Sequence, residues 1–447
     1  MFGHRQQNPL PGLTRPKIPR DGSLVASLDV GAAKTVCFIA RMTPVDIGPL
    51  DCEIIGAGHF GAPLDGSPAD EGMSRPDYRM PPSFAARERA IRHSVDAAEA
   101  MASERIEAVH VSVPAQSISC VRVAVDLDVS GGFVTAEDIT DSLAEGVSLT
   151  TPDQCTSLHV SPIGYAIDGE MVGTDPRGMR GRRLTTFMLG INASENTLST
   201  LRAVVEAAGL EVLGFIAGPL AGSEAILIDD EKDLGVLALD LGAHAVGYSL
   251  FSEGRMAGCG GCLPGAGFIT RDVSSAFSTP LAHAERQKIL HGTVFGGAGD
   301  EHRFVDMAGF TPTDPRTRIS KADMTDVIVP RMEEIYEAVT RKLVTDQLDL
   351  DRLRRIVLTG GGSQLHGLCE HVERAFSMKA RLGRPDALHG LPEALTGPAF
   401  AVGVGVLRYL ACLWGTDALY PEIDRLPSDL RARSARAAGA GWRRLRF

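Results

Sequence analysis

Two aspartates that lie far apart in the chain, Asp29 and Asp240, stand in the same local setting. Each follows an apolar run, comes two positions before a glycine, and leads into a second apolar run. The two segments read LVASLDVGAAKTVCFIA and LGVLALDLGAHAVGYSLF. Carboxylates at two facing turns can hold Mg²⁺, usually through water, while the metal neutralises nucleotide phosphates. The pattern therefore predicts that Asp29 and Asp240 form a metal-binding pair.

A third loop has related chemistry, because residues 355–362 (RIVLTGGG) form an apolar run that ends in three glycines. At tight glycine turns the backbone N–H groups converge and can cradle phosphate oxygens without side-chain obstruction. We expect the third loop to pass beneath a nucleotide base or ribose, where a side chain would clash. The predicted nucleotide-binding residues of the three loops are Asp29, Gly31, Ala32, Ala33, Lys34, Asp240, Gly242, Ala243, His244, Gly360, Gly361, Gly362 and Ser363.

Each loop also has a simpler explanation when it is taken alone. A single Asp-x-Gly segment is usually only a hairpin turn, and an apolar strand that ends in glycines can be purely structural. His244 has a similarly simple alternative, since most histidines in such loops are ordinary surface residues. The combination of all three loops, in this order and at this spacing, favours a nucleotide-binding site.

The elements that must position these loops follow from the hydrophobic pattern. Segments 24–40 and 234–251 each predict two strands joined by the Asp-x-Gly turn, which indicates an internal duplication. Further strands are predicted at residues 108–113, 117–127, 157–167, 184–191, 210–216 and 355–362. Helices are predicted at residues 84–102, 136–145, 194–208, 267–277, 281–291, 321–346 and from about 363 onward.

Length and charge limit the classes of protein that fit. A chain of 447 residues suggests two or more domains. The net charge of −11 argues against a nucleic acid partner for the body of the protein. The eight cysteines include one C-x-x-C pair, Cys259 and Cys262, without a second pair, so they favour a reducing compartment over a zinc site. Residues 1–21 have no apolar core and predict a disordered lead-in.

Residues 398–414 are apolar enough to be mistaken for a membrane span. The segment is short for a bilayer and carries Arg408 in its interior. A buried helix that packs against a sheet is therefore the favoured interpretation, and we expect a soluble body.

The C-terminal end has a charge pattern of its own. Residues 430–447 carry six arginines and no acidic residue in an otherwise acidic chain. On a helix, Trp442 and Leu445 share a face, so this end can fold on an anionic bilayer. A disordered basic end that happens to contain a tryptophan is the alternative. The residues expected to contact the membrane are Trp442, Arg443, Arg444, Leu445, Arg446 and Phe447.

These motifs resemble those of the actin, Hsp70 and sugar-kinase superfamily, and within it the FtsA family of bacterial cell-division proteins. The first and second loops resemble the family's phosphate-1 and phosphate-2 motifs, and residues 358–368 (LTGGGSQLHGL) its adenosine motif. Residues 284–292 (AERQKILHG) resemble its AE-x-x-K…G segment, in which Glu285 and Lys288 would border the ribose and base. Residues 217–221 resemble the segment that hinges the two halves.

The resemblance implies a mixed α/β, actin-like fold of two lobes, with duplicated ribonuclease-H-like domains and a C-terminal amphipathic helix. It implies subdomain 1A at residues 22–103 and 179–222, and the family's own insert, subdomain 1C, at 104–178. Subdomain 2A would cover residues 223–264 and 350–416, and subdomain 2B residues 265–349. A linker (417–438) and a membrane-targeting helix (439–447) would follow.

The same resemblance implies a function. The chain is expected to bind ATP and Mg²⁺, to polymerise with itself, and to tether filaments of the tubulin homologue FtsZ to the membrane. FtsZ would bind subdomain 2B, and later division proteins would bind subdomain 1C. The expected location is peripheral, on the cytoplasmic side of the inner membrane at the division site, with anionic lipid as a partner.

The second loop departs from the family pattern. Relatives have a second glycine and a hydroxyl side chain here, whereas this chain has Ala243, His244 and Ala245. We therefore expect ATP binding with at most weak hydrolysis. The polar loop at residues 63–82 has no assigned role. Two alternatives remain open: a small-molecule kinase of the same superfamily and a pilus-assembly adaptor of the PilM type.

Overall fold

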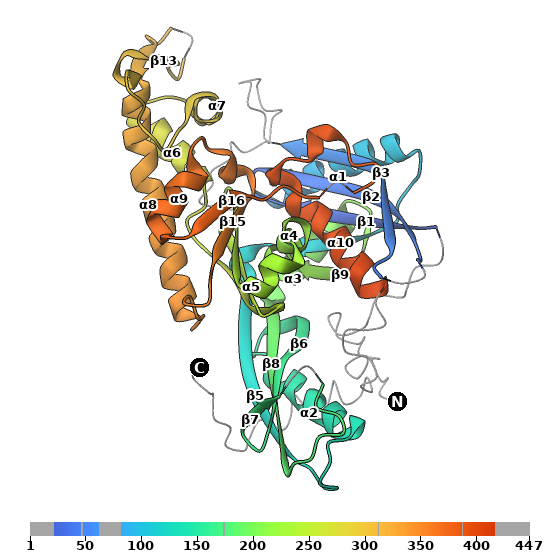
Figure 1. Ribbon diagram of the computed structural model, residues 1–447. Helices are drawn as coiled ribbons and strands as arrows, with labels where there is room; N and C mark the ends of the chain where they lie inside the picture. The colour runs from blue at the N-terminus through green and yellow to red at the C-terminus, as the bar shows by residue number, and fades with distance from the viewer. Residues whose placement is uncertain are drawn as a thin grey trace, which may run out of the picture.

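The computed structural model describes residues 22–45, 48–61, 82–172, 175–311, 313–386 and 388–415. The predicted N-terminal lead-in, nearly all of the 63–82 loop, the linker and the C-terminal helix lie outside these described residues. Two lobes stand side by side, and a smaller sheet-and-helix unit extends below them (Figure 1).

The first lobe is built on a five-stranded sheet in the order β3-β2-β1-β4-β9. Strands β1 and β2 are antiparallel and form the predicted first hairpin, in which Asp29 pairs with Val36. Strand β4 runs parallel to β1, and β9 runs parallel to β4. The strands are β1 (Ser23–Val30), β2 (Lys34–Thr43), β3 (Asp51–Gly61), β4 (Ala108–Val113) and β9 (Glu211–Ala217).

The second lobe repeats this arrangement in its own sheet, with the order β12-β11-β10-β15-β16. Its first two strands again form an antiparallel hairpin, in which Asp240 pairs with Gly247, and β15 runs parallel to β10. The strands are β10 (Val236–Leu241), β11 (Val246–Ser252), β12 (Arg255–Cys262), β15 (Arg355–Thr359) and β16 (Lys379–Leu382). The predicted internal duplication is confirmed, and it places both Asp-x-Gly turns at the same end of their sheets.

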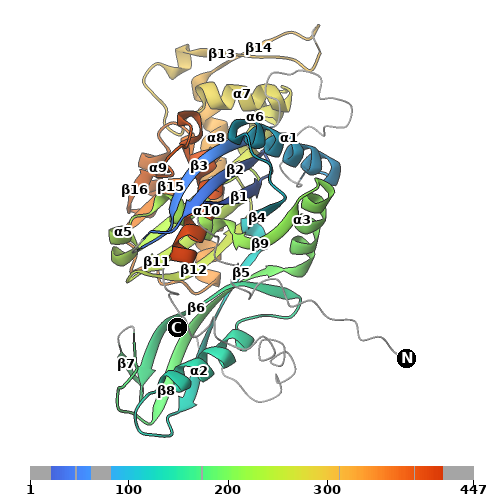
Figure 2. The ribbon, with the colours of Figure 1, turned by 90° about the vertical axis from the view of Figure 1, so that its right-hand side faces the viewer.

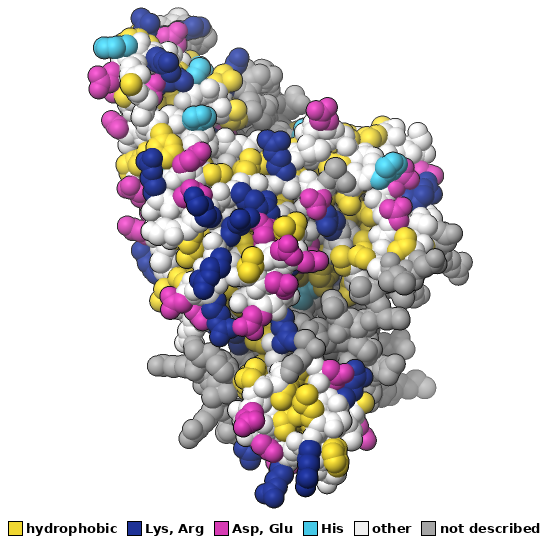
Figure 3. Space-filling model, viewed as in Figure 1, with side chains coloured by type: hydrophobic (Ala, Val, Ile, Leu, Met, Phe, Trp, Pro, Cys, Tyr) yellow, Lys and Arg dark blue, Asp and Glu magenta, His cyan; other side chains and the backbone are white. Residues whose placement is uncertain are grey.

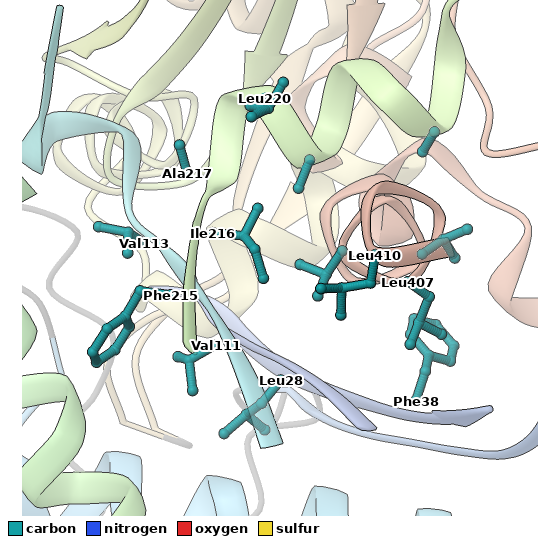
Figure 4. Close-up of a cluster of buried hydrophobic side chains, with 14 of the residues drawn as sticks. Leu28, Phe38, Val111, Val113, Phe215, Ile216, Ala217, Leu220, Leu407 and Leu410 are labelled. Carbon is teal, nitrogen blue, oxygen red and sulfur yellow. The ribbon is translucent and has the colours of Figure 1, made fainter. Parts of the chain in front are cut away.

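Helices pack on the two sheets and join the lobes. In the first lobe, α1 (Phe84–Ala102) packs on β2 and β3, and α3 (Glu195–Ala207) precedes β9. Helix α10 (Ala401–Gly415) lies between the first sheet and α4 (Gly218–Ile226), with Leu407 and Leu410 pointing into the core (Figure 4). The Ser27 hydroxyl donates a hydrogen bond to the Gly403 carbonyl at 2.9 Å, and both residues are buried. The predicted buried helix is therefore confirmed.

A helical subdomain covers the outer part of the second lobe. It contains α6 (Gly267–Ala276), α7 (Leu281–His291) and α8 (Lys321–Thr345), close to their predicted bounds. The pattern did not predict its hairpin of β13 (Phe304–Met307) and β14 (Thr317–Ser320), because four-residue strands give too short an alternation. Helix α8 begins with a capping box between Ser320 and Asp323.

The unit below the lobes is a four-stranded antiparallel sheet in the order β5-β8-β6-β7, and we call it the insert. Its elements are β5 (Ile118–Asp128), α2 (Ala136–Leu149), β6 (Cys155–Ile167), β7 (Glu170–Val172) and β8 (Arg183–Ser194). Helix α2 closes one face of this sheet around a separate core that includes Leu143, Leu184 and Met188. The insert and the β13–β14 hairpin lie at opposite ends of the molecule (Figure 2).

The glycine-rich third loop ends differently from its prediction. A short 3₁₀ turn, η3 (Gly361–Gln364), comes first, and α9 (Leu368–Phe376) begins only after Gly367, whose φ is +79°. The remaining elements are α5 (Asp229–Leu234) and the 3₁₀ turns η1 (Ala115–Ser117), η2 (Asp300–His302), η4 (Glu393–Leu395) and η5 (Pro398–Phe400). Among the described residues, none of the helices combines the length and the apolar character that a bilayer crossing requires.

Candidate nucleotide-binding site

A cavity of about 1190 Å³ lies between the two lobes, and residues of all three predicted loops line it. Glu285 and Lys288 line it as well. Ser363 is the exception among the predicted residues, since it is buried and its hydroxyl donates to the Gly360 carbonyl at 2.7 Å. The predicted residues that share this cavity are Asp29, Gly31, Ala32, Ala33, Lys34, Asp240, Gly242, Ala243, His244, Glu285, Lys288, Gly360, Gly361 and Gly362.

The two Asp-x-Gly turns have matching geometry. A Cβ atom added to Gly31 would lie 2.8 Å from the Lys34 carbonyl oxygen. A Cβ atom added to Gly242 would lie 2.7 Å from the Ala245 carbonyl oxygen. Both separations are too short for real atoms, so each turn closes this tightly only because a glycine occupies that position.

The second turn is fixed against the start of α6 by three backbone hydrogen bonds. The N–H groups of Gly265, Ala266 and Gly267 donate to the carbonyls of His244, Gly242 and Ala243 at 2.8, 2.8 and 2.9 Å. The C=O and N–H groups of a trans peptide point in opposite directions. The N–H groups that follow these carbonyls, from Ala243 to Ala245, are therefore directed away from α6, as a phosphate cradle requires.

The third loop packs directly on the second turn. Gly360 has a φ of +82°, and a Cβ atom there would collide with the Asp240 carboxylate. A Cβ atom on Gly362 would lie 2.9 Å from the Leu241 carbonyl oxygen. Gly361 is different, because an added Cβ atom would have open space within 4 Å. Two of the three glycines thus serve packing between loops, and clearance for a ligand remains an explanation for Gly361 alone.

Two carboxylates and one ammonium meet at the floor of the cavity. Burial raises the pKa of Asp29, and a 2.5 Å hydrogen bond from Ser112 and the charge of Lys34 oppose this rise. Burial, with the charge of Asp29, raises the pKa of Asp240 to about 6. Burial lowers the pKa of Lys34 to about 8, against the pull of both carboxylates. Ionising both carboxylates in this buried cluster is therefore unfavourable, and a bound cation would stabilise their charged forms.

Lys34 is held by a loop that also supports the third glycine turn. Its ammonium donates to the Ala399 carbonyl and lies 3.8 Å from the centroid of the Phe400 ring. The neighbouring Pro398 carbonyl accepts from the Gly360 N–H and the Thr359 hydroxyl, each at 3.1 Å. The η5 segment therefore connects the first and third loops across the lobes.

The donor set fits a Mg²⁺–nucleotide complex. Mg²⁺ usually keeps several waters and takes one or two carboxylates plus substrate phosphates. In the part of the chain that the structure describes, no group of three or more His, Cys, Asp or Glu side chains could hold a metal ion alone. Asp29 and Asp240 therefore suit a metal that arrives with its own phosphate ligands.

Glu285 and Lys288 form a small polar network on the other side of the cavity. The Lys288 ammonium lies 2.7 Å from the Glu285 carboxylate and 2.9 Å from the Thr270 hydroxyl, which itself donates to Glu285. Thr270, on α6, was not predicted from the sequence. The network presents fixed polar groups of the kind that bind a ribose or base edge.

Other cavity residues gave no motif signal. Ser112, which binds Asp29, comes from the end of β4, and Thr293 pairs with His366 of the third loop region. A further polar wall comes from the first lobe and includes Arg87, Gln116, Ser117, Asn196, Thr197 and Thr200. These positions are brought to the cavity by tertiary folding, so no local spacing could have revealed them.

Two lobes with the same sheet order, joined over a cleft with an Asp-x-Gly turn on each side, define an actin-like fold. A solved PilM–PilN complex of type IV pilus biogenesis has this fold, with a TM-score of 0.57 and 16% identity. That match covers 88% of this chain and 99% of the other.

Sequence comparisons identify the family within this class. The family model described as cell division protein FtsA matches residues 237–405, and the SHS2 domain inserted in FtsA matches residues 115–191. Cell division protein FtsA of Agrobacterium fabrum is 32% identical over 405 residues, which cover 88% of each chain. The Escherichia coli K12 protein of that name is 28% identical over 87% of this chain and 90% of its own. The chain belongs to the FtsA family.

Proposed function

We propose that this protein binds ATP with Mg²⁺ in the cleft, polymerises on the inner face of the cytoplasmic membrane, and tethers FtsZ filaments there. The observation that carries the nucleotide part is the meeting of Asp29, Asp240 and Lys34 at the junction of the two lobes. A ligand that contacts both turns makes favourable interactions with both lobes only when the cleft is closed. Binding therefore favours the closed state.

The second turn supports binding without rapid turnover. Neither Ala243 nor His244 nor Ala245 carries a hydroxyl that could position an attacking water. Positioning of that water is a main contribution of the protein to phosphoryl transfer. We therefore propose that ATP is held as a structural ligand and that any hydrolysis is weak.

Membrane contact is proposed from sequence alone, because residues 439–447 lie outside the described residues. Each arginine near an anionic surface contributes about 1 kcal/mol, so one tail binds weakly and reversibly. Many tails along a filament bind together through their high effective concentration. Polymerisation and membrane attachment are therefore coupled in this proposal.

The proposed protein partners dock at the two ends of the molecule. The hairpin of the helical subdomain exposes Phe304 and Phe310, which supports FtsZ binding at residues 265–349. The insert exposes Phe133 and Met171, and hydrophobic side chains gather on it (Figure 3), which supports binding of later division proteins at the insert. Basic and acidic side chains are interspersed on this face of the lobes (Figure 3), which argues against a nucleic acid partner.

The direct test is recruitment of FtsZ to anionic liposomes by the full chain. We expect FtsZ to sediment with the liposomes when the chain and Mg²⁺–ATP are present, and not when either is omitted. Lys34→Ala should weaken ATP binding, measured by calorimetry, whereas Lys379→Ala at a mostly exposed site should not. Transfer of phosphate to small-molecule acceptors, with no FtsZ recruitment, would instead support the kinase alternative.

A further inference from the structure

The cavity extends along the first lobe beyond the three glycine loops and the Glu285–Lys288 network. Side chains from the start of α1, from η1 and from the start of α3 form a polar wall there. None of them belongs to the three glycine loops or to the Glu285–Lys288 network. The wall consists of Arg87, Gln116, Ser117, Asn196, Thr197 and Thr200, and we call it the lobe-1 wall.

The direction of α1 carries Arg87 past the end of the sheet. Gly56 of β3 packs against Ala98 of α1, and Gly58 packs against Ser94, so the helix runs antiparallel to the strand. The Ser94 hydroxyl donates to the carbonyl of Thr35, the residue after Lys34, at 3.1 Å. The N-terminal part of α1 therefore extends beyond the end of the sheet where the first Asp-x-Gly turn lies.

Helix geometry then fixes the side on which Arg87 lies. Arg87 comes seven residues before Ser94, which is two helical turns or about 10 Å along the axis. Residues seven apart share one face of a helix, so Arg87 lies on the face that Ser94 turns toward the sheet. This face overhangs the first turn, in agreement with the place of Arg87 among the cavity-lining residues.

The charge of Arg87 has no carboxylate partner among the described residues. Its Nε donates to the Pro82 carbonyl at 2.9 Å, which leaves the terminal nitrogens of the guanidinium available to a ligand. Burial lowers the pKa of Arg87. On the same helix, Arg92 is paired with Glu88 at 3.0 Å. A half-buried cation without a counter-charge is costly, and a bound anion would remove that cost.

The other residues of the lobe-1 wall, which line the same cavity as Arg87, are suited to an anion. They are hydroxyls and amides, which can donate hydrogen bonds without adding negative charge. The hydroxyls of Thr197 and Ser117 already lie 3.2 Å apart. The cavity of about 1190 Å³ also exceeds the range of roughly 300–1,000 Å³ that small-molecule sites usually occupy.

We propose that Arg87 and the lobe-1 wall form a subsite for a phosphate group, which the planar guanidinium binds through two hydrogen bonds. The proposal rests on the proposed nucleotide cleft and adds a residue outside its motifs. The phosphate has two possible sources: the terminal phosphate of the bound nucleotide, or a separate inorganic phosphate beside it.

Calorimetry on the full chain separates these sources with Arg87→Gln, and with Arg92→Gln as the matched control on the same helix. If the nucleotide supplies the phosphate, Arg87→Gln should weaken ATP binding by roughly tenfold or more and leave ADP binding unchanged. If the phosphate is separate, ATP and ADP affinities should stay the same, and binding of inorganic phosphate to the ADP complex should be lost. Arg87→Lys should restore part of either effect, because it keeps the charge.

The proposal is overturned if Arg87→Gln changes none of these three affinities, or if Arg92→Gln changes them equally. Thermal unfolding of the same variants shows whether Arg87→Gln has a folding defect. If it does, the affinities of Arg87→Lys for ATP, ADP and phosphate test the proposal in its place. If the wild-type chain binds neither ATP nor ADP, the proposed nucleotide function fails. Phosphate binding to the wild type and to Arg87→Gln without nucleotide then still tests the subsite.

Discussion

Asp240 links the chemistry of the cleft to the pH dependence of folding. Its pKa is raised to about 6 in the folded state, whereas an unfolded aspartate titrates near 3.8. Between these values the folded state binds more protons than the unfolded state, so stability falls as the pH rises from about 4 to about 6. Ionisation of Asp240 therefore lowers the stability of the nucleotide-free protein over this range, whereas the lowered pKa values of the buried His110 and His159 act in the opposite direction.

Asp240→Asn should remove that loss, because an amide does not ionise. Between pH 4 and 6, the thermal unfolding midpoint of the variant, measured without nucleotide, should fall less or rise more than that of the wild type. Asp128→Asn is the control, since the Asp128 side chain is 93% exposed. Identical pH profiles for Asp240→Asn and the wild type would contradict the electrostatic account of the cleft.

At this scale the sequence predicted what turn chemistry demands. Asp29, Gly31 and Lys34, which line the cavity, were predicted because a tight turn that can hold a phosphate needs these residue types at this spacing. Arg87 and Thr270 could not be found in this way. They lie on helices with no local motif, and only the packing of α1 and α6 brings them to the cavity.

Among the elements, the third loop gives a matched pair of substitutions. Gly360→Ala places a Cβ atom against Asp240 at a φ of +82°, so it should destabilise the fold by about 2 kcal/mol or more. Gly361→Ala meets open space and should leave stability nearly unchanged.

The two substitutions, Gly360→Ala and Gly361→Ala, also distinguish the effect of packing on stability from the effect of a side chain on ligand binding. Gly361 lines the cavity, so Gly361→Ala should weaken nucleotide binding even though the protein remains stable. Chemical denaturation measures the first property and calorimetry with ATP measures the second. Equal stability losses in the two variants would show that the added methyl group at Gly360 does not meet the Asp240 carboxylate.

Element prediction succeeded where periodic patterns were long. The two hairpins, α8 and the buried α10 all carry extended patterns, and their bounds agree closely with the sequence-based ranges. The β13–β14 hairpin was missed because its strands are only four residues each. The start of α9 was predicted too early. The short 3₁₀ turn η3 comes first, and Gly367, with a φ of +79°, separates this turn from the helix.

For the whole molecule, the C-terminal residues set the strength of membrane attachment. Removing residues 439–447 should abolish co-sedimentation with anionic liposomes, because it removes Trp442 and three of the arginines. Binding by the intact chain should also fall with added salt, which screens the arginines.

The deletion variant needs two comparisons. ATP affinity of the truncated chain should equal that of the wild type, since the cleft is built from residues before 416. Intact chain at concentrations that allow polymerisation should bind liposomes more steeply than dilute chain. Liposome binding that survives the deletion unchanged would sink the tether proposal and favour the adaptor alternative.

The duplicated sheets repeat one charged group of the cleft and not the other. Each lobe supplies an aspartate, but the position five residues later is Lys34 in the first lobe and Ala245 in the second. At the floor of the cavity, the two carboxylates and one ammonium leave a local excess of negative charge, which attracts a divalent cation. Once the cation is present the balance reverses. If the chain binds nucleotide as proposed, Mg²⁺ should therefore increase the affinity of the cleft for ATP, because the metal reverses the local charge that ATP meets between the two turns.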